Sequence, residues 1–286
     1  PASALKELVE NAIDAGATRV RITIENGGKT LIEVADDGSG MGREDAVLSL
    51  DRHATSKIRS AADLTGVTTF GFRGEALPAI ASVSRMRLRT RARGAAEGFE
   101  IRIEGGKLLE SRAAGGPEGT RIEVADLFAN VPARRKFLKS AATEWGHVAE
   151  WLARAALALP SVHFDVQHDD RPALTWPAVS DPIERVAAVL SEREAEGLVP
   201  TRATEGALCI EGFVSRPDVQ RSSAAGLHLF VNRRPVRDRL LRHALLDAYR
   251  DVLPRGRYPT ALLFLEVPPE AVDVNESAVS VSTGTS

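Results

Sequence analysis

The chain is poor in the residues that build disulfides, metal clusters and membrane spans. Its 286 residues include one cysteine, Cys209, which excludes an internal disulfide and argues against a structural zinc site. No apolar run reaches the length of a membrane span, and no secretory leader is visible. The chain also lacks a starting Met, so we expect a fragment. Its length and its 43% hydrophobic content predict two domains of an intracellular globular protein.

The chain also lacks an excess of charge of either sign, since its net charge is only −2. The whole chain is therefore not a basic nucleic-acid binder. Between Val231 and Tyr258, however, there are three aspartates and eight arginines, a local charge of +5. The arginines are Arg233, Arg234, Arg237, Arg239, Arg242, Arg250, Arg255 and Arg257. Either a solvated helix face or a surface for DNA phosphates has this composition.

A second arginine series alternates with other residues from Arg85 to Arg93. Because successive side chains of a strand point to opposite faces, all five of these arginines fall on one face. We expect an exposed, arginine-rich strand face here.

The segment from Lys6 to Ala17, KELVENAIDAGA, has the spacing of an amphipathic helix that ends at Gly16. One helical face is apolar: Leu5, Leu8, Ala12 and Ala15. Another face carries three carboxylates and an amide: Glu7, Glu10, Asn11 and Asp14. We interpret this stripe as functional, because Asn11 is a middling helix former and a ligand-binding loop follows.

That loop comes after a predicted hairpin of two strands. Arg19 to Glu25 alternates apolar and polar residues, Gly27-Gly28 is predicted as the turn, and Thr30 to Ala35 as the returning strand. The second strand runs into Asp36-Asp37-Gly38-Ser39-Gly40. Asp36 can accept a hydrogen bond from an exocyclic amine, and glycines let a ligand approach the backbone closely. Alone, this pattern is also typical of ordinary turns.

Two further motifs favour a nucleotide. Gly71-Phe72-Arg73-Gly74 opens the apolar run from Ala76 to Val83, and free N–H groups at the start of a helix bind phosphate. Gly119-Thr120 opens another predicted strand, where a small hydroxyl residue can border a base. Other nucleotide motifs are excluded: Thr23 occupies the first glycine position of a P-loop ending at Thr30, and Arg43 replaces the third glycine of a dinucleotide fingerprint.

The second part of the chain begins near Trp176 to Pro182, where prolines and polar residues interrupt the pattern. Helices are predicted over Glu144 to Leu159, Pro182 to Ser191 and Asp238 to Leu253. Strands are predicted over Ala207 to Val214, Leu227 to Val231 and Thr260 to Val267.

Five motifs, in order, resemble the GHKL ATPase superfamily and are most similar in spelling to its MutL mismatch-repair branch. They are KELVENAIDAGA, DDGSGM, RHATSKI, GFRGEALPAIASVS and DLFANVPARRKFLK. The resemblance covers Pro1 to about Asn275. It implies an α/β (α+β) two-layer sandwich of the GHKL (Bergerat) type over residues 1–179. A smaller α/β domain with a ribosomal-protein-S5-like fold follows over residues 180–275, and residues 276–286 are left as a divergent tail.

The resemblance also implies roles for individual residues. Glu7 matches the general base that orients the attacking water, Asn11 the Mg²⁺ ligand, and Asp36 the adenine reader. The remaining ATP contacts implied are Gly38, Gly40, Thr55, Ser56, Lys57, Gly71, Phe72, Arg73, Gly74 and Thr120. Glu10 either supports the helix face or is a solvated carboxylate. The segment VNRRPVRDR resembles a DNA-groove segment of the family and suggests Arg234, Arg237 and Arg239 as DNA contacts.

The function implied is an ATP-binding and hydrolysing region of a bacterial, cytoplasmic, nucleoid-associated repair protein. Its cofactors are ATP and Mg²⁺. Its partners are DNA, a second copy through ATP-dependent dimerisation, a mismatch-recognition protein of the MutS type, and a downstream nuclease or helicase, with no membrane. A nucleotide-gated DNA scaffold with little turnover and a topoisomerase ATPase subunit are the alternatives, although the latter does not account for NVPARRKF.

The chain departs from the family at its end. After Val-Asp-Val-Asn the family continues with His-Pro-x-Lys, whose lysine reaches the γ-phosphate. This chain continues instead with Glu276-Ser277-Ala278-Val279, and it has no lysine after Lys139. We therefore expect poor turnover of ATP. We expect no structural role for the ending Ser280 to Ser286.

Overall fold

The computed structural model describes residues 1–51, 75–236 and 238–268, and the backbone of residues 272–275 and 278–281. The chain divides into two compact units. Unit 1 comprises Pro1–Ala153 and Pro160–Ser180, and unit 2 comprises Arg154–Leu159 and Asp181–Ser286. Every helix in these described ranges is too short or too polar to cross a lipid bilayer.

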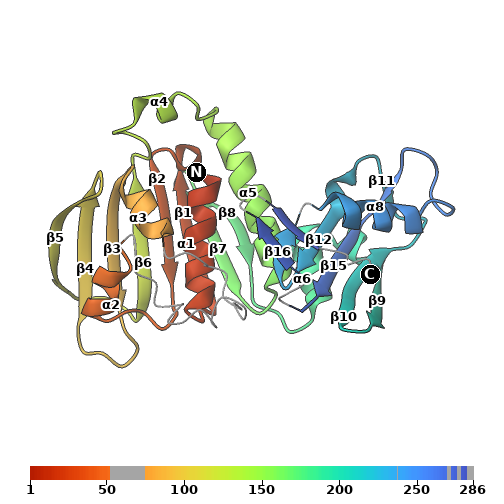
Figure 1. The fold of residues 1–286 in the computed structure, drawn as a ribbon, viewed down its shortest axis with the longest axis horizontal. Helices are drawn as coiled ribbons and strands as arrows, with labels where there is room; N and C mark the ends of the chain where they lie inside the picture. Colours follow the sequence, from red (N-terminus) through yellow and green to blue (C-terminus); the bar gives the residue numbers. More distant parts are fainter. Residues whose placement is uncertain (52–74, 237, 269–271, 276–277, 282–286) are drawn as a thin grey trace. The chain divides into compact units, whose positions relative to one another are not determined.

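Unit 1 is built on an eight-stranded sheet with the order β5-β4-β3-β6-β2-β1-β7-β8 (Figure 1). Its strands are β1 (Arg19–Glu25), β2 (Leu31–Asp36), β3 (Arg85–Arg91), β4 (Gly98–Glu104), β5 (Lys107–Ala114), β6 (Gly119–Ala125), β7 (His163–His168) and β8 (Arg171–Trp176). Neighbouring strands are antiparallel except β1 and β7, which are parallel. The helices are α1 (Ala2–Asp14), α2 (Arg43–Leu48), α3 (Ala76–Ala81), α4 (Pro132–Arg135) and α5 (Ala141–Ala158).

The layers follow from the alternation of apolar residues. Val20, Ile22 and Ile24 of β1 are all fully buried on one face of the sheet. On that side α1, α2 and α3 cover the sheet (Figure 1), and α1 buries Leu5, Leu8 and other apolar residues. The first part of the chain is therefore a two-layer sandwich, as the sequence predicts.

The β1–β2 hairpin has the predicted strands but a longer connection. Asn26–Gly28 forms a short 3-10 helix, η1, where the sequence predicts a two-residue turn. Gly27 has φ +66°, and a Cβ placed there would lie 2.4 Å from the carbonyl oxygen of Ala141. The glycine is thus required by the close approach of the chain at the start of α5, which no local pattern reveals.

The arginine-rich face of β3 is not simply exposed, which corrects the expectation. Glu100 of β4 has a fully buried side chain and receives hydrogen bonds from Arg87, Arg89, Arg102 and Arg112. Burial acts to raise the pKa of this carboxyl, but the arginines, Arg89 first, hold it below its ordinary value. The arginines of β3 thus belong to an ion-pair network across neighbouring strands.

Unit 2 is built on a five-stranded sheet with the order β13-β12-β15-β10-β9. Its elements are α6 (Pro182–Val189), α7 (Glu192–Glu196), β9 (Leu198–Glu205), β10 (Leu208–Ser215), β11 (Gln220–Arg221), η3 (Ala224–Gly226), β12 (Leu227–Val231), β13 (Arg234–Val236), α8 (Arg239–Ala248), β14 (Tyr258–Pro259), β15 (Ala261–Glu266), β16 (Val272–Asn275) and β17 (Ala278–Val281). Its core joins the end of α5, through Leu157, to Val186 of α6 and to stacked rings of Phe230 and Phe264.

The predicted elements of this part of the chain occur, with shifted ends. The helix predicted to Ser191 ends at Val189, because Ser191 caps α7 by accepting a hydrogen bond from Glu194 N–H (3.2 Å). The helix predicted to Leu253 ends at Ala248. The ending also has more structure than expected, since Ser280 and Val281 belong to β17, which pairs with β16.

Candidate functional site

Three polar side chains lie in one row across the middle of the unit 1 sheet. In the strand register, Asp36 of β2 faces Thr120 of β6, and Thr120 faces Thr90 of β3. The hydroxyl oxygens of Thr90 and Thr120 are 3.1 Å apart. The register therefore brings together a carboxylate and two hydroxyls from strands that are far apart in the sequence.

Asp36 is held by its backbone neighbours through one oxygen. Its Oδ1 accepts hydrogen bonds from the N–H groups of Gly38 (2.9 Å) and Thr120 (3.3 Å). Oδ2 accepts none from the residues that the structure describes, so it is available to a ligand. Burial raises the pKa of Asp36 to about 6, against these hydrogen bonds, which act to lower it. At neutral pH the carboxylate is thus mostly ionised and can accept a further hydrogen bond.

Glycines around Asp36 leave no room for side chains. A Cβ at Gly38 would lie 2.9 Å from Asp36 Oδ1 and from Ala15. At Gly40 (φ +62°) it would lie 2.0 Å from the carbonyl oxygen of Arg91, and at Gly119 (φ +104°) 2.1 Å from that of Asp36. The backbone of the loop is therefore packed directly against β3 and β6.

Asp37 fixes this loop to the connection between α1 and β1. Its carboxylate accepts hydrogen bonds from Thr18 N–H (2.8 Å), Thr18 Oγ1–H (2.7 Å) and Arg19 N–H (2.8 Å). Although partial burial acts in the other direction, these bonds hold the pKa of Asp37 below its ordinary value. Ser39 N–H also donates to the carbonyl of Ala15 (2.8 Å). Two adjacent carboxylates thus have different tasks, Asp37 as an anchor and Asp36 with one oxygen open.

The predicted polar stripe of α1 is split in the structure. Glu7, Asn11 and Asp14 are half-buried, whereas Glu10 is only 9% exposed. Glu10 lies 3.9 Å from Lys6 Nζ. Glu10 is thus not a solvated carboxylate, and its burial fits support of the helix. Glu7 and Asn11, one turn apart, belong to the helix whose C-terminal end is joined to the Asp36 loop.

Several predicted contacts lie outside the described residues. These are Thr55, Ser56, Lys57, Gly71, Phe72, Arg73, Gly74 and Arg237. The helix predicted to follow the Gly71 loop is present as α3, which begins at Ala76.

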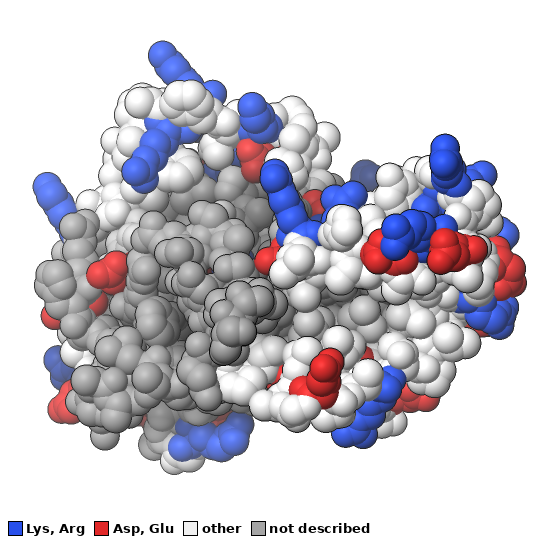
Figure 2. Space-filling model, turned by 45° about the vertical axis from the view of Figure 1, so that its right-hand side comes forward, with Lys and Arg blue, Asp and Glu red and all other residues white. Residues whose placement is uncertain are grey.

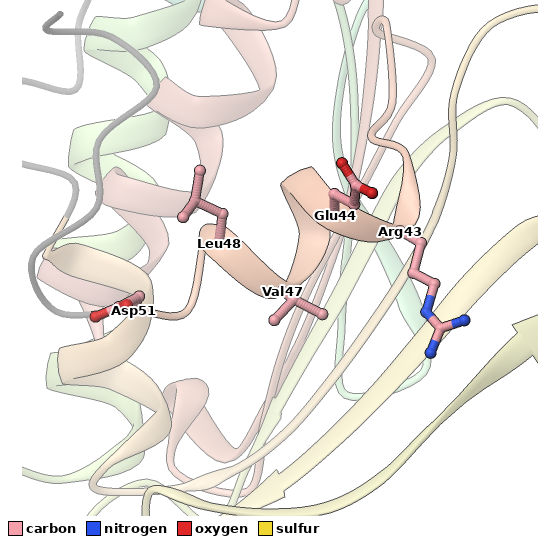
Figure 3. Close-up of a pocket in the computed structure, with 5 residues that line it drawn as sticks. All are labelled: Arg43, Glu44, Val47, Leu48 and Asp51. Atoms are coloured by element: carbon pink, nitrogen blue, oxygen red, sulfur yellow. The ribbon is translucent and has the colours of Figure 1, made fainter.

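A shallow pocket lies on α2 and the turn that follows it (Figure 3). It is lined by Arg43, Glu44, Val47, Leu48 and Asp51, all within one short stretch of chain. Val47 is 51% exposed and Leu48 43% exposed. The pocket contains none of the predicted site residues.

The arginine-rich segment of unit 2 is only partly neutralised by ion pairs. Arg233 pairs with Glu211 (3.3 Å) and Glu266 (3.2 Å), and Arg250 pairs with Asp247 (2.7 Å). Four others form no ion pair with a described acidic residue: Arg239, Arg242, Arg255 and Arg257. Asp238 is used as the N-cap of α8, accepting from Leu241 N–H (2.9 Å).

Sequence reasoning missed Thr90 and the anchoring role of Asp37. Thr90 is 4% exposed, and its hydroxyl accepts from Met41 N–H (2.8 Å) and donates to the carbonyl of Gly119 (3.2 Å). The only local signal was that Thr90 lies in the segment from Arg85 to Arg93, on the strand face opposite to the arginines. Its partners come from two other segments, so its role required the register.

Comparison with known proteins defines the class of this fold. Residues 1–107 match the family model described as histidine kinase-, DNA gyrase B-, and HSP90-like ATPase. Residues 186–277 match the model of the DNA mismatch repair protein, C-terminal domain. The chain is thus a GHKL-type ATPase region followed by an S5-like domain, and the predicted fold class is confirmed.

Individual relatives define the family. The chain is 52% identical over 276 residues to the DNA mismatch repair protein MutL of Geobacter sulfurreducens, covering 96% of the chain and 45% of that protein. It is similar to the solved Aquifex aeolicus MutL ATPase domain complexed with ADP, with 33% identity, a TM-score of 0.71, and coverage of 94% of this chain and 92% of that one. The chain therefore belongs to the MutL family of DNA mismatch repair proteins, and it spans less than half the length of the curated relatives that it matches.

Proposed function

We propose that unit 1 binds ATP with Mg²⁺ and hydrolyses it, and that this reaction drives dimer closure and DNA binding in mismatch repair. The observation that carries the proposal is the Asp36–Thr120–Thr90 row beside a glycine loop, which the Ser39 N–H hydrogen bond to the Ala15 carbonyl holds to the C-cap of α1. The Asp36 carboxylate in this row suits adenine, because the exocyclic amine of adenine can donate a hydrogen bond to the open Oδ2 of Asp36. The similar Aquifex aeolicus domain was solved with ADP, which supports the same ligand class here.

Each remaining residue has a proposed task. Glu7 orients a water for attack on the γ-phosphate, a general-base role that a half-buried carboxylate can fill. Gly38 and Gly40 shape the base pocket, and Thr120 borders it. Thr55, Ser56, Lys57, Gly71, Phe72, Arg73 and Gly74 complete the proposed ATP contacts.

The described residues fit a Mg²⁺ ion that arrives with the nucleotide. They contain no group of three or more His, Cys, Asp or Glu side chains able to hold a metal by themselves. Asn11 offers one hard oxygen ligand, and Mg²⁺ commonly takes its other ligands from phosphates and waters. When bound, the ion neutralises phosphate charge. We propose Asn11 as the protein ligand.

Nucleotide affinity and single-turnover hydrolysis, measured side by side, test this function. Binding of ADP and ATP with measurable single-turnover hydrolysis supports an ATPase. Binding without hydrolysis favours the alternative, a nucleotide-gated DNA scaffold, for which the missing lysine is the specific observation. Absence of nucleotide binding would overturn both.

The missing lysine leads to a prediction. Phosphoryl transfer depends chiefly on stabilising charge at the transferred group, so a chain without the His-Pro-x-Lys lysine should turn ATP over poorly and prefer ATP over ADP only slightly. Inserting His-Pro-x-Lys in place of Glu276 to Val279 should raise single-turnover hydrolysis about tenfold or more. The matched control, His-Pro-x-Gln, should not. Rapid hydrolysis by the unaltered chain would mean that another cation fills this role.

We also propose that unit 2 contacts DNA phosphates through Arg234, Arg237 and Arg239. Arg239 is exposed and is the first residue of α8. A cation at the positive end of a helix is unfavourable by about 0.3–1 kcal/mol, so Arg239 does not serve helix stability. With the free N–H groups of the helix start, it suits a phosphate.

DNA affinity should therefore depend on Arg239 and on salt. Arg237→Glu, combined with Arg239→Glu, should weaken binding of a duplex irrespective of its sequence. It should also flatten the plot of log K against log salt by about 0.9 for each lost phosphate contact. Arg216→Glu, which removes an arginine paired with Asp218 (3.3 Å), is the control in the same unit. Equal effects of the two changes would indicate that the arginine segment is a solvated surface and does not contact DNA.

We propose the partners and the cellular location of the full-length protein from its family. A full-length protein would dimerise through its ATP-loaded units and act with a MutS-type protein and a downstream nuclease or helicase. It would work in the bacterial cytoplasm, near the nucleoid.

A further inference from the structure

The hydroxyl of Thr90 is the most deeply buried group of the polar row in unit 1. Asp36 and Thr120 are half-buried, whereas Thr90 is only 4% exposed. The three residues face one another in the register of β2, β6 and β3, so their side chains lie on the same face of the sheet. These strands run side by side in the middle of the sheet (Figure 1). Thr90 is thus placed to act on a ligand through Thr120.

The contacts of the Thr90 hydroxyl determine where the protons of this row lie. Met41 N–H donates to its oxygen (2.8 Å), the carbonyl of Gly119 accepts its proton (3.2 Å), and the hydroxyl oxygen of Thr120 is 3.1 Å away. A hydroxyl has one proton and two acceptor sites, whereas a backbone N–H can only donate and a carbonyl can only accept. All three contacts are therefore hydrogen bonds at the same time in one arrangement only, in which Thr120 donates to Thr90.

This proton order fixes what Thr120 offers to a ligand. Its single proton is used on Thr90, so its oxygen turns only lone pairs towards the space beside Asp36. The ionised carboxylate of Asp36 is also only an acceptor. The two side chains thus form a pair of acceptors, which suits the two N–H donors of an exocyclic amine and opposes a carbonyl oxygen in the same place.

We propose that Thr90 is a positioning residue that makes the pocket select 6-aminopurines over 6-oxopurines, because it holds the Thr120 hydroxyl as an acceptor. The inference rests on the proposed function, since it takes the Asp36 row as the adenine site. Adenine carries an amine at the 6-position, whereas hypoxanthine and guanine carry an oxygen there, which accepts and cannot pair with either side chain. Without the Thr90 hydroxyl, Thr120 is free to turn its proton outward and to donate to that oxygen.

The ratio of ADP affinity to inosine diphosphate (IDP) affinity, measured by titration calorimetry, tests this role. The two nucleotides differ only in the 6-position group and the proton that accompanies it. They carry the same phosphates, so the lysines and arginines that project from the described surface in Figure 2 attract both equally, and the ratio reports the base. Thr90→Val keeps the shape of the side chain without its hydroxyl. It should lower the ratio about 2- to 12-fold, the usual worth of one hydrogen bond.

Further variants separate proton order from packing. Thr90→Ser keeps the hydroxyl and should keep the ratio of the unaltered chain. Thr120→Val should lower the ratio by itself, so it tests the proposal even if Thr90→Val does not fold. Adding Thr90→Val to Thr120→Val should lower the ratio no further, because no hydroxyl is left to orient. Thr23→Val, at a half-buried threonine on the opposite face of the sheet, is the matched control and should leave the ratio unchanged.

The outcomes distinguish this inference from the proposed function. A chain that binds neither nucleotide would overturn both. A chain that prefers ADP to IDP, but keeps the same ratio in Thr90→Val or in Thr120→Val, would retain the proposed function and overturn the role of Thr90. A ratio that rises in Thr90→Val would mean that Thr120 donates to the base, and this opposite proton order would also overturn the inference.

Discussion

Replacing Glu7 with alanine is expected to lower ATP turnover by roughly 10²-fold or more while ADP and ATP affinity stay within a few-fold of the unaltered chain. A positioned general base is typically worth 10²–10⁴ in rate, and its removal affects the chemical step more than the ground state. Glu7 is half-buried on α1, and the apolar side chains that pack this helix, such as Leu5 and Leu8, are unaffected by the change. Glu7→Ala should therefore lose turnover while it keeps its nucleotide affinity.

Two further variants make the Glu7 test specific. Glu7→Gln keeps the size and a hydrogen-bond acceptor but cannot take a proton, so its turnover should be as low as that of Glu7→Ala. Asp14→Asn removes another half-buried carboxylate from the same helix and should change turnover little. If Glu7→Ala loses affinity and turnover in equal measure, Glu7 is structural and the general-base assignment is wrong.

Local pattern was sufficient for the elements that carry the candidate site. The alternation of Val20, Ile22 and Ile24 predicts β1 with its observed bounds. The apolar face of the first helix predicts the burial of Leu5, Leu8 and Ala12, but it misses Val9 and Glu10, which are also buried, and Ala15 is only half-buried. Asp36 was found because it ends a strand and precedes a glycine pair, which is visible within a few residues. These features depend on near neighbours in the sequence, so they can be read without the fold.

Features that depend on distant segments could not be predicted. Thr90 matters because β3 and β2 flank β6 in a register that aligns it with Asp36. The arginines of β3 were expected to be solvated, since the carboxylate that gathers them, Glu100, lies on another strand. Gly27 similarly acquires its role from Ala141, over a hundred residues away. Non-local pairing, and not composition, decides each case.

Asp36→Asn is expected to weaken adenine nucleotides strongly while making the nucleotide-free chain more stable at pH 7. The amide can turn a donor towards the adenine amine, so the hydrogen bond is lost and a buried polar group is left unmatched. Loss of a hydrogen bond to a charged group costs about 1.5–3 kcal/mol, which corresponds to roughly 10- to 150-fold in affinity. Titration calorimetry with ADP, compared with GDP as the control base, measures this loss.

The stability change follows from the raised pKa of Asp36. Burial lifts this pKa from 3.8 to about 6, so folding favours the protonated carboxyl. Its contribution to stability is fully present below pH 3.8 and is lost as the pH rises through about 6. At pH 7 the ionised carboxylate therefore costs on the order of 1–3 kcal/mol, which the neutral amide removes, raising Tm by several degrees.

The pH dependence separates this account from a simple loss of packing. At pH 4 the carboxyl is already mostly protonated, so Asp36→Asn should melt close to the unaltered chain, and the gain should emerge between pH 4 and 7. Over the same range, the affinity of the unaltered chain for ADP should rise with pH as the carboxylate ionises. A variant that is less stable at every pH, or an ADP affinity that does not change through pH 6, would show that Asp36 holds the loop and does not read the base.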